Sequence, residues 1–119
     1  MKGPDKVIHK PWGTSQCVLQ TPFVELHHIL IVDGGYCSEH IHHHKWSRIH
    51  IISGVLGILL YSGTGFNTVE LKAGEYVDIQ PGIKHKFKSS GEVEAFESYW
   101  VELCEDIERF SDSGVAEIK

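Results

Sequence analysis

The chain has 119 residues, with 11 Lys and Arg against 16 Asp and Glu, and a formal net charge of -5 with histidine neutral. A chain of this length suits one hydrophobic core, so we expect a single domain over residues 1–119. The net acidity argues against a partner recognised through nucleic-acid phosphates, and the 41% hydrophobic content argues against a disordered chain.

The sequence also predicts a cytoplasmic protein without a membrane partner. The first ten residues contain three lysines and no apolar run, unlike a secretory signal. The most apolar stretch, residues 49–61, is interrupted by His50, Ser53, Gly54 and Gly57 and is shorter than the roughly 20 apolar residues that span a bilayer. The three cysteines are widely spaced, which favours reduced thiols over a disulfide framework.

Short apolar or β-branched runs recur along the chain, and Gly, Pro, Asn or Asp ends each one. In chain order these runs are residues 16–19, 23–32, 48–52, 55–61, 67–71, 76–79, 85–88 and 93–103. Many short strands with regular turn signals are typical of a β-sandwich or barrel. Helical periodicity occurs only in residues 104–110 and predicts a short C-terminal helix. We therefore expect an all-β barrel with a short helical tail.

Nine histidines are an unusual number for a chain of this size, and four of them, His40, His42, His43 and His44, lie shortly before the run at residues 48–52. Alternate side chains of a strand share a face, so His40, His42 and His44 would point the same way and could share a metal ion. Downstream, a Pro-Gly turn leads into His85, which a closed barrel could bring to the same ion. His50 is a further candidate ligand, with an outward-facing strand histidine as the alternative.

These motifs resemble the cupin superfamily. Its first motif has the frame glycine, five residues, His-x-His, a short gap, Glu, six residues, glycine. Gly34, His40-Ile41-His42, Ser47 and Gly54 reproduce that frame, and Gln80-Pro81-Gly82-Ile83-Lys84-His85 resembles the second motif. The resemblance implies a double-stranded β-helix, which is a jelly-roll-like barrel, with a divalent metal ion.

A closer resemblance is to the cupin domain of type II mannose-6-phosphate isomerases, which also occurs at the C-terminus of mannose-1-phosphate guanylyltransferases. It rests on Lys10-Pro11-Trp12-Gly13, on the segment at residues 42–48 and on the acidic stretch at residues 105–110. This family frame selects His42 and His44 as ligands, whereas the general cupin frame selects His40 and His42. Ser47 stands where the family has a ligating Glu, and the family's terminal Tyr-Gly-Arg is absent.

The resemblance implies an enzyme that converts mannose 6-phosphate to fructose 6-phosphate, or a related aldose–ketose isomerase. Zinc is the first choice of metal, because imidazole suits it, but imidazole also suits Mn, Fe and Ni. Glu97, whose position resembles one facing the barrel interior in the family, is the candidate general base. The candidate phosphate-binding residues are the cations that flank the two motifs: Lys45, Arg48, Lys84 and Lys86.

Two other functions fit the same residues. The serine at position 47 and the missing terminal arginine favour a non-catalytic module that binds a sugar or sugar nucleotide. Another metal-dependent cupin reaction, such as an iron-dependent dioxygenase, is the third. Because exposed strands of small barrels are often covered by a second copy, we also expect a homodimer.

Overall fold

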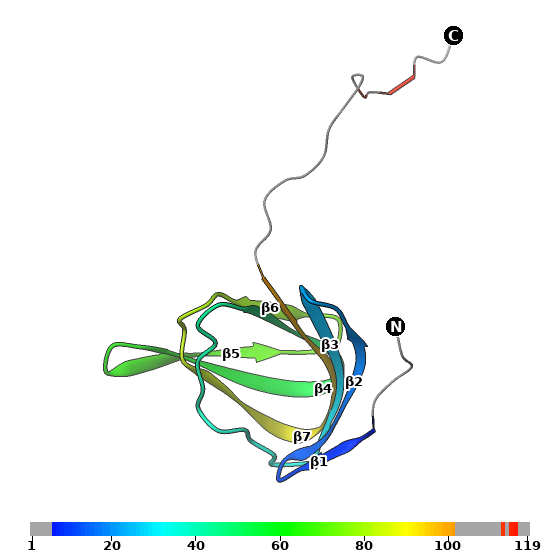
Figure 1. Cartoon of the computed structure of the whole chain (residues 1–119). Helices are drawn as coiled ribbons and strands as arrows, with labels where there is room; N and C mark the ends of the chain where they lie inside the picture. The colour runs from blue at the N-terminus through cyan, green and yellow to red at the C-terminus, as the bar shows by residue number, and fades with distance from the viewer. Residues whose placement is uncertain (1–5, 102–112, 114, 117–119) are drawn as a thin grey trace.

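The computed structural model describes residues 6–101, 113, 115 and 116, and this part of the chain contains seven strands and no helix. The strands are β1 (Ile8–Lys10), β2 (Gly13–Gln20), β3 (Val24–Ile31), β4 (Trp46–Ser62), β5 (Gly65–Leu71), β6 (Tyr76–Ile79) and β7 (His85–Trp100). They curve around a common interior (Figure 1). The prediction of an all-β barrel is thus confirmed, whereas the predicted helix at residues 104–110 lies outside the described residues. No helix in the described residues is long and apolar enough to cross a membrane.

The two longest strands, β4 and β7, lie side by side in the middle of the sheet. They pair antiparallel from Trp46 opposite Trp100 to Leu60 opposite His85. Strand β3 lies on the other side of the second half of β7, and β6 lies on the other side of the first half of β4. Strand β5 pairs with the second half of β4, while β1 and β2 continue the sheet beyond β3. The first half of β4, the second half of β7, β3 and β6 form one wall of the barrel. The second half of β4, the first half of β7 and β5 form the other. Each long strand therefore belongs to both walls.

The sequence predicts a turn at Ser53-Gly54, but the structure has a bulge there. The register between β4 and β7 shifts on either side of Ser53, and the strand continues to Ser62. Gly54 has a φ of 91°, which β-branched and bulky residues rarely adopt. A bulge bends a strand without ending it, so the two predicted runs at residues 48–52 and 55–61 form one strand. The runs at residues 85–88 and 93–103 likewise belong to the single strand β7.

The hydrophobic core lies between the two walls. Side chains of β3, β4 and β7 alternate between the interior and the outer surface, as the period of two requires. The fully buried apolar residues of these strands are Ile29, Ile49, Ile51, Leu56, Ile58 and Ala95. Trp12 is partly buried and packs against the core, with its indole edge-on to the Phe87 ring at 5.1 Å between centroids.

A side chain at Gly54 should destabilise the fold much more than one at a glycine in open space. A Cβ at Gly54 would clash with the carbonyl oxygen of Glu92 on β7, in addition to the strain of its positive φ. We expect Gly54→Ala to lower the free energy of unfolding by about 3 kcal/mol. Gly63 also has a positive φ, 58°, but no atom lies near its Cβ position, so Gly63→Ala should cost only about 1 kcal/mol. Urea unfolding of both variants checks this, and equal losses would contradict it.

Candidate metal centre

Three histidines from the two predicted motifs meet inside the barrel: His40, His42 and His85. Their candidate ligand atoms all lie within 4.8 Å of one another. The imidazole centroids are 4.2 Å apart for His40 and His85, 5.1 Å for His40 and His42, and 5.7 Å for His42 and His85. These three residues are called the histidine cluster below.

Backbone hydrogen bonds hold the two halves of the cluster together. The His40 amide donates to the His85 carbonyl and the His85 amide donates to the His40 carbonyl, both at 3.0 Å. The Gly82 amide also donates to the His42 carbonyl at 2.8 Å. The Pro-Gly turn that leads into β7 is thus fixed to the His-x-His segment, so the ring positions depend on backbone geometry rather than on flexible side chains.

Hydrogen bonds also orient two of the rings. His40 Nδ1 donates to the Ser38 carbonyl at 2.9 Å, and His85 Nδ1 donates to the Ile83 carbonyl at 2.8 Å. A carbonyl can only accept, so Nδ1 carries the proton and Nε2 presents its lone pair in each ring. The Nε2 atom of His42 is buried and has no hydrogen-bond partner within the described structure. Metal-ligating histidines typically donate their other ring N–H to a carbonyl or carboxylate, so the cluster fits a metal ion.

The charge state of the cluster suits a cation too. Burial lowers the pKa of His42 below its ordinary value, and the neighbouring His40 and Lys45 lower it further. Burial likewise lowers the pKa of His85, against a smaller opposing effect of its hydrogen bond to Ile83. Both rings are therefore neutral at neutral pH, which is the form that coordinates a metal.

The structure does not bring His44 and His50 to the cluster. His44 is exposed in the loop before β4, with His43 as its ring neighbour. His50 is exposed on β4 opposite Tyr76, because Ser47, Ile49 and Ile51 occupy the inward positions. The geometry thus follows the general cupin frame, with His40 and His42, and not the frame with His42 and His44.

Ser47 occupies the inward position at which the family has a glutamate. Its side chain is 2% exposed, and its hydroxyl has no hydrogen-bond partner among the described residues. Ser47 pairs with Tyr99 on β7, and the Tyr99 ring lies 4.9 Å from the His42 ring between centroids. The serine is therefore paired with the residue whose ring contacts His42, and at this inward position the chain has an uncharged polar group instead of a carboxylate.

A cavity of about 560 Å³ opens beside the cluster, and His40 is part of its wall. Glu97 and Tyr99 on β7 also line it, and the Tyr99 hydroxyl hydrogen-bonds to the Glu97 carboxyl. Burial raises the pKa of Glu97 above its usual range, while the hydrogen bond from Tyr99 and the nearby His40 partly offset that rise. Burial and the adjacent Glu97 raise the pKa of Tyr99, so the phenol stays protonated. A proton acceptor thus lies in the same cavity as the candidate metal site.

The four cations predicted to bind substrate do not line this cavity. Lys45 Nζ pairs with Glu25 at 3.0 Å, and Arg48 donates two hydrogen bonds to Asp78 at 2.6 and 2.9 Å. Because of these contacts, the charges of Lys45 and Arg48 are already partly neutralised. The remaining two lie over aromatic rings at the surface, namely Lys84 over Tyr61 and Lys86 over Tyr36.

Sequence reasoning missed the contribution of Tyr99, Lys10 and His27, which all line the cavity. Alternation along β7 could have found Tyr99, because it shares the inward face of Glu97. His27 shares the inward face of β3 with Ile29 and pairs directly with Glu97. Lys10 carries no such signal, because strand β1 was not predicted.

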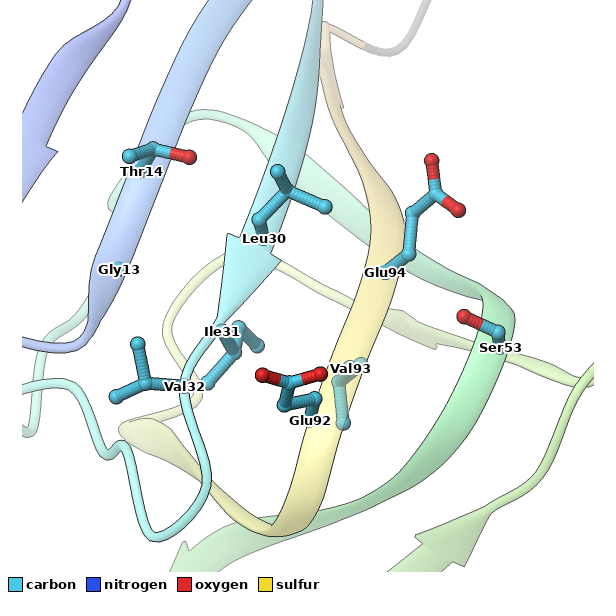
Figure 2. A pocket seen from close by; sticks show the side chains of 9 residues that line it. All are labelled: Gly13, Thr14, Leu30, Ile31, Val32, Ser53, Glu92, Val93 and Glu94. Atoms are coloured by element: carbon cyan, nitrogen blue, oxygen red, sulfur yellow. The ribbon is translucent and has the colours of Figure 1, made fainter.

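A second depression, of about 380 Å³, lies along β2, β3 and β7 (Figure 2). Leu30 lines this depression and is 46% exposed. Glu94 also lines it, and its carboxylate pairs with His28 Nε2 at 2.7 Å. No residue of the histidine cluster lines this depression. It is therefore separate from the candidate metal centre.

Comparison with solved structures identifies the fold. The chain superposes on KdgF from Halomonas sp. with a TM-score of 0.72, covering 83% of this chain and 90% of KdgF at 12% identity. The cupin domain of Cnp3 from Schizosaccharomyces pombe gives a TM-score of 0.68 at 12% identity, covering 75% of this chain and 64% of that one. This protein has the cupin fold. The predicted double-stranded β-helix is thereby confirmed.

Sequence comparison adds a second relationship for this chain. It is 29% identical over 86 residues to a mannose-1-phosphate guanylyltransferase from Klebsiella pneumoniae, which is 72% of this chain. It is 30% identical over 84 residues to the enzyme of that name from Escherichia coli, which is 71% of this chain. Both matches cover 17% of the relative's length, and no family model matches the chain. The resemblance predicted from the motifs is confirmed by this similarity.

Substitution of the cluster should separate its histidines from the others. We expect His40→Ala, His42→Ala and His85→Ala each to weaken Zn²⁺ binding by at least about 100-fold, because each removes one of three ligands. His44→Ala and His50→Ala are matched controls from the same segment and should bind Zn²⁺ as the unmodified protein does. Titration calorimetry on metal-stripped protein measures this. A loss at His44 as large as that at His85 would show that the metal lies elsewhere.

The buried hydroxyl of Ser47 should cost stability. We expect Ser47→Ala to raise the free energy of unfolding of the metal-free protein by about 1 kcal/mol, since it removes an unsatisfied buried polar group. Ser89 is the matched control: it is 5% exposed, and its hydroxyl donates to the Val32 carbonyl at 2.8 Å. Ser89→Ala should therefore lower stability by about 1 kcal/mol. Denaturant unfolding measures both changes, and destabilisation by Ser47→Ala would contradict the interpretation.

Proposed function

We propose that this cupin is a divalent-metal enzyme that interconverts an aldose phosphate and a ketose phosphate, with mannose 6-phosphate as the first substrate to test. The observation that carries the proposal is the single cavity shared by His40 of the cluster and the Glu97–Tyr99 pair. An aldose–ketose isomerase needs a polarised carbonyl and a nearby base, and this cavity brings residues for both together.

The choice of a sugar phosphate rests on similarity rather than on the cavity. About 70% of the chain is similar to two mannose-1-phosphate guanylyltransferases, whose name includes a phosphorylated sugar. In the segment at residues 10–13, which resembles the isomerase domain, Lys10, Pro11 and Trp12 line the cavity. Zinc is the first metal to test because all three ligands are imidazoles. Manganese is the second, since the structurally similar oxalate decarboxylase from Bacillus subtilis has Mn(II) centres.

The residues of the cavity have distinct roles in this proposal. A metal ion held by His40, His42 and His85 would polarise the carbonyl and hydroxyl oxygens of the open-chain sugar and acidify the C2 proton. The Glu97 carboxylate accepts that proton and returns it to C1, while the proton of the C2 hydroxyl passes to the C1 oxygen. Its raised pKa makes it a stronger base than an exposed glutamate. The Tyr99 hydroxyl, which donates to Glu97, keeps the carboxylate oriented.

A second candidate function is binding of a sugar phosphate without turnover. Ser47 favours it, because a hydroxyl is a much poorer metal ligand than the carboxylate that the family has there. Saturable binding of mannose 6-phosphate with no product in any metal would support this function and would overturn the isomerase proposal.

The isomerase proposal is tested by activity and by substitution of Glu97. Protein loaded in turn with Zn²⁺, Mn²⁺, Ni²⁺ or Fe²⁺ is incubated with mannose 6-phosphate, and fructose 6-phosphate is detected by a coupled assay. We expect turnover with at least one metal, and Glu97→Gln should lower kcat by about 100-fold or more without loss of metal. Glu94→Gln is the matched control, because Glu94 faces outward on the same strand. No turnover in any metal, or an unchanged kcat in Glu97→Gln, would contradict the proposal.

A further inference from the structure

Lys10 is the cation of the cavity beside the histidine cluster. It is the last residue of β1 and is exposed, so its place on the cavity wall puts it at the mouth. Its charge attracts the negative charge of Glu97, and no carboxylate of the described residues lies within ion-pair distance of its ammonium group. Lys45, Arg48 and Lys84, by contrast, are each paired with a carboxylate. Lys10 therefore has a charge that a ligand can use.

Local structure holds Lys10 at this position. Its backbone pairs with Gly13 in the β1–β2 hairpin, and the Val32 amide donates to the Trp12 carbonyl at 2.9 Å. Gly13 permits the close approach, because a Cβ there would clash with the carbonyl oxygen of Leu30; the two residues lie on adjacent strands in Figure 2. The hairpin is thus anchored against β3, and the base of the Lys10 side chain is anchored with it.

Two further polar residues line the cavity, one on β2 and one on β3. Ser15 lies on β2, and His27 lies on β3 opposite Glu97. The His27 ring is also edge-on to Tyr99 at 5.7 Å between centroids. An ammonium, an imidazole and a hydroxyl together form a donor set that suits a phosphate, which accepts several hydrogen bonds at once. The volume of about 560 Å³ lies within the range of small-molecule sites.

We propose that Lys10, with His27 and Ser15, forms an anion subsite that binds the phosphate group of the substrate beside the metal cluster. The inference rests on the proposed function for the identity of the substrate as a sugar phosphate. It does not depend on turnover, because the subsite acts in binding. It replaces the motif-flanking cations as the phosphate anchor: the charge comes from the N-terminal hairpin and not from the strands that carry the histidines.

The subsite is tested by binding to metal-stripped protein and to protein loaded with Zn²⁺. Titration calorimetry with mannose 6-phosphate, mannose and inorganic phosphate should show that the unmodified protein prefers mannose 6-phosphate to mannose. We expect Lys10→Met to weaken mannose 6-phosphate binding by about 10-fold or more and to remove this preference, while Lys10→Arg keeps most of it. Lys72→Met, at an exposed lysine outside the cavity wall, is the matched control and should bind as the unmodified protein does.

The outcomes separate this inference from the proposed function. Weakened binding in Lys10→Met supports the subsite even if the isomerase assay shows no product, since the protein would then be a binding module. Turnover by the unmodified protein with unchanged binding in Lys10→Met overturns the subsite alone. Loss of binding in Lys86→Met but not in Lys10→Met would likewise overturn it, as would the absence of any preference for mannose 6-phosphate over mannose in both metal states. Thermal unfolding of each variant checks that the fold is intact.

Discussion

The reciprocal pair of backbone hydrogen bonds between His40 and His85 is the constraint on which the candidate site depends. These residues are 45 positions apart and belong to different motifs, and neither segment alone presents three ligands. The bonds place the His-x-His segment beside the start of β7, on the side of that strand away from β4. Since backbone bonds set the position, the rings converge before any metal binds, and less ordering is needed when an ion enters.

The long strands β4 and β7 transmit that constraint to the rest of the cavity. The inward face of β7 carries His85 at one end and Glu97 and Tyr99 at the other, so one strand supplies both a ligand and the candidate base. The bulges around Ser53 bend β4, which lets it follow β7 from one wall to the other. The geometry between His85 and the candidate base is therefore set by one strand, whereas His40 and His42 come from the segment between β3 and β4, which backbone hydrogen bonds hold against the start of β7.

Much of this could be predicted from the sequence, because a strand's period of two and glycine's backbone freedom are local properties. They correctly indicated a barrel and the approach of His85 to the His-x-His segment. Strand alternation also predicted one shared face for His40, His42 and His44, but these residues lie between β3 and β4, outside the named strands, and only the first two join the cluster. The sequence could not show whether Ser53-Gly54 forms a turn or a bulge, because a glycine with positive φ fits both equally well. The same ambiguity left the facing of His50 open, since the position of a bulge decides which residues of β4 point inward. The place of Lys10 on the cavity wall was not predicted, because it depends on where a short hairpin packs.

Ser47, where the resembled cupin motif has a glutamate, decides how much negative charge lies near the histidine cluster. A glutamate at this position would add a fourth ligand and a negative charge next to a cavity that already contains Glu97. With serine, the negative charge of the cavity is limited to one carboxyl group, whose own pKa is raised by burial. A phosphate would then meet Lys10 and the cluster with less repulsion than beside two carboxylates. In the proposed function, a serine would bind a metal ion more weakly than a glutamate but would repel an anionic substrate less, so Ser47 and the charge of Lys10 would act in the same direction.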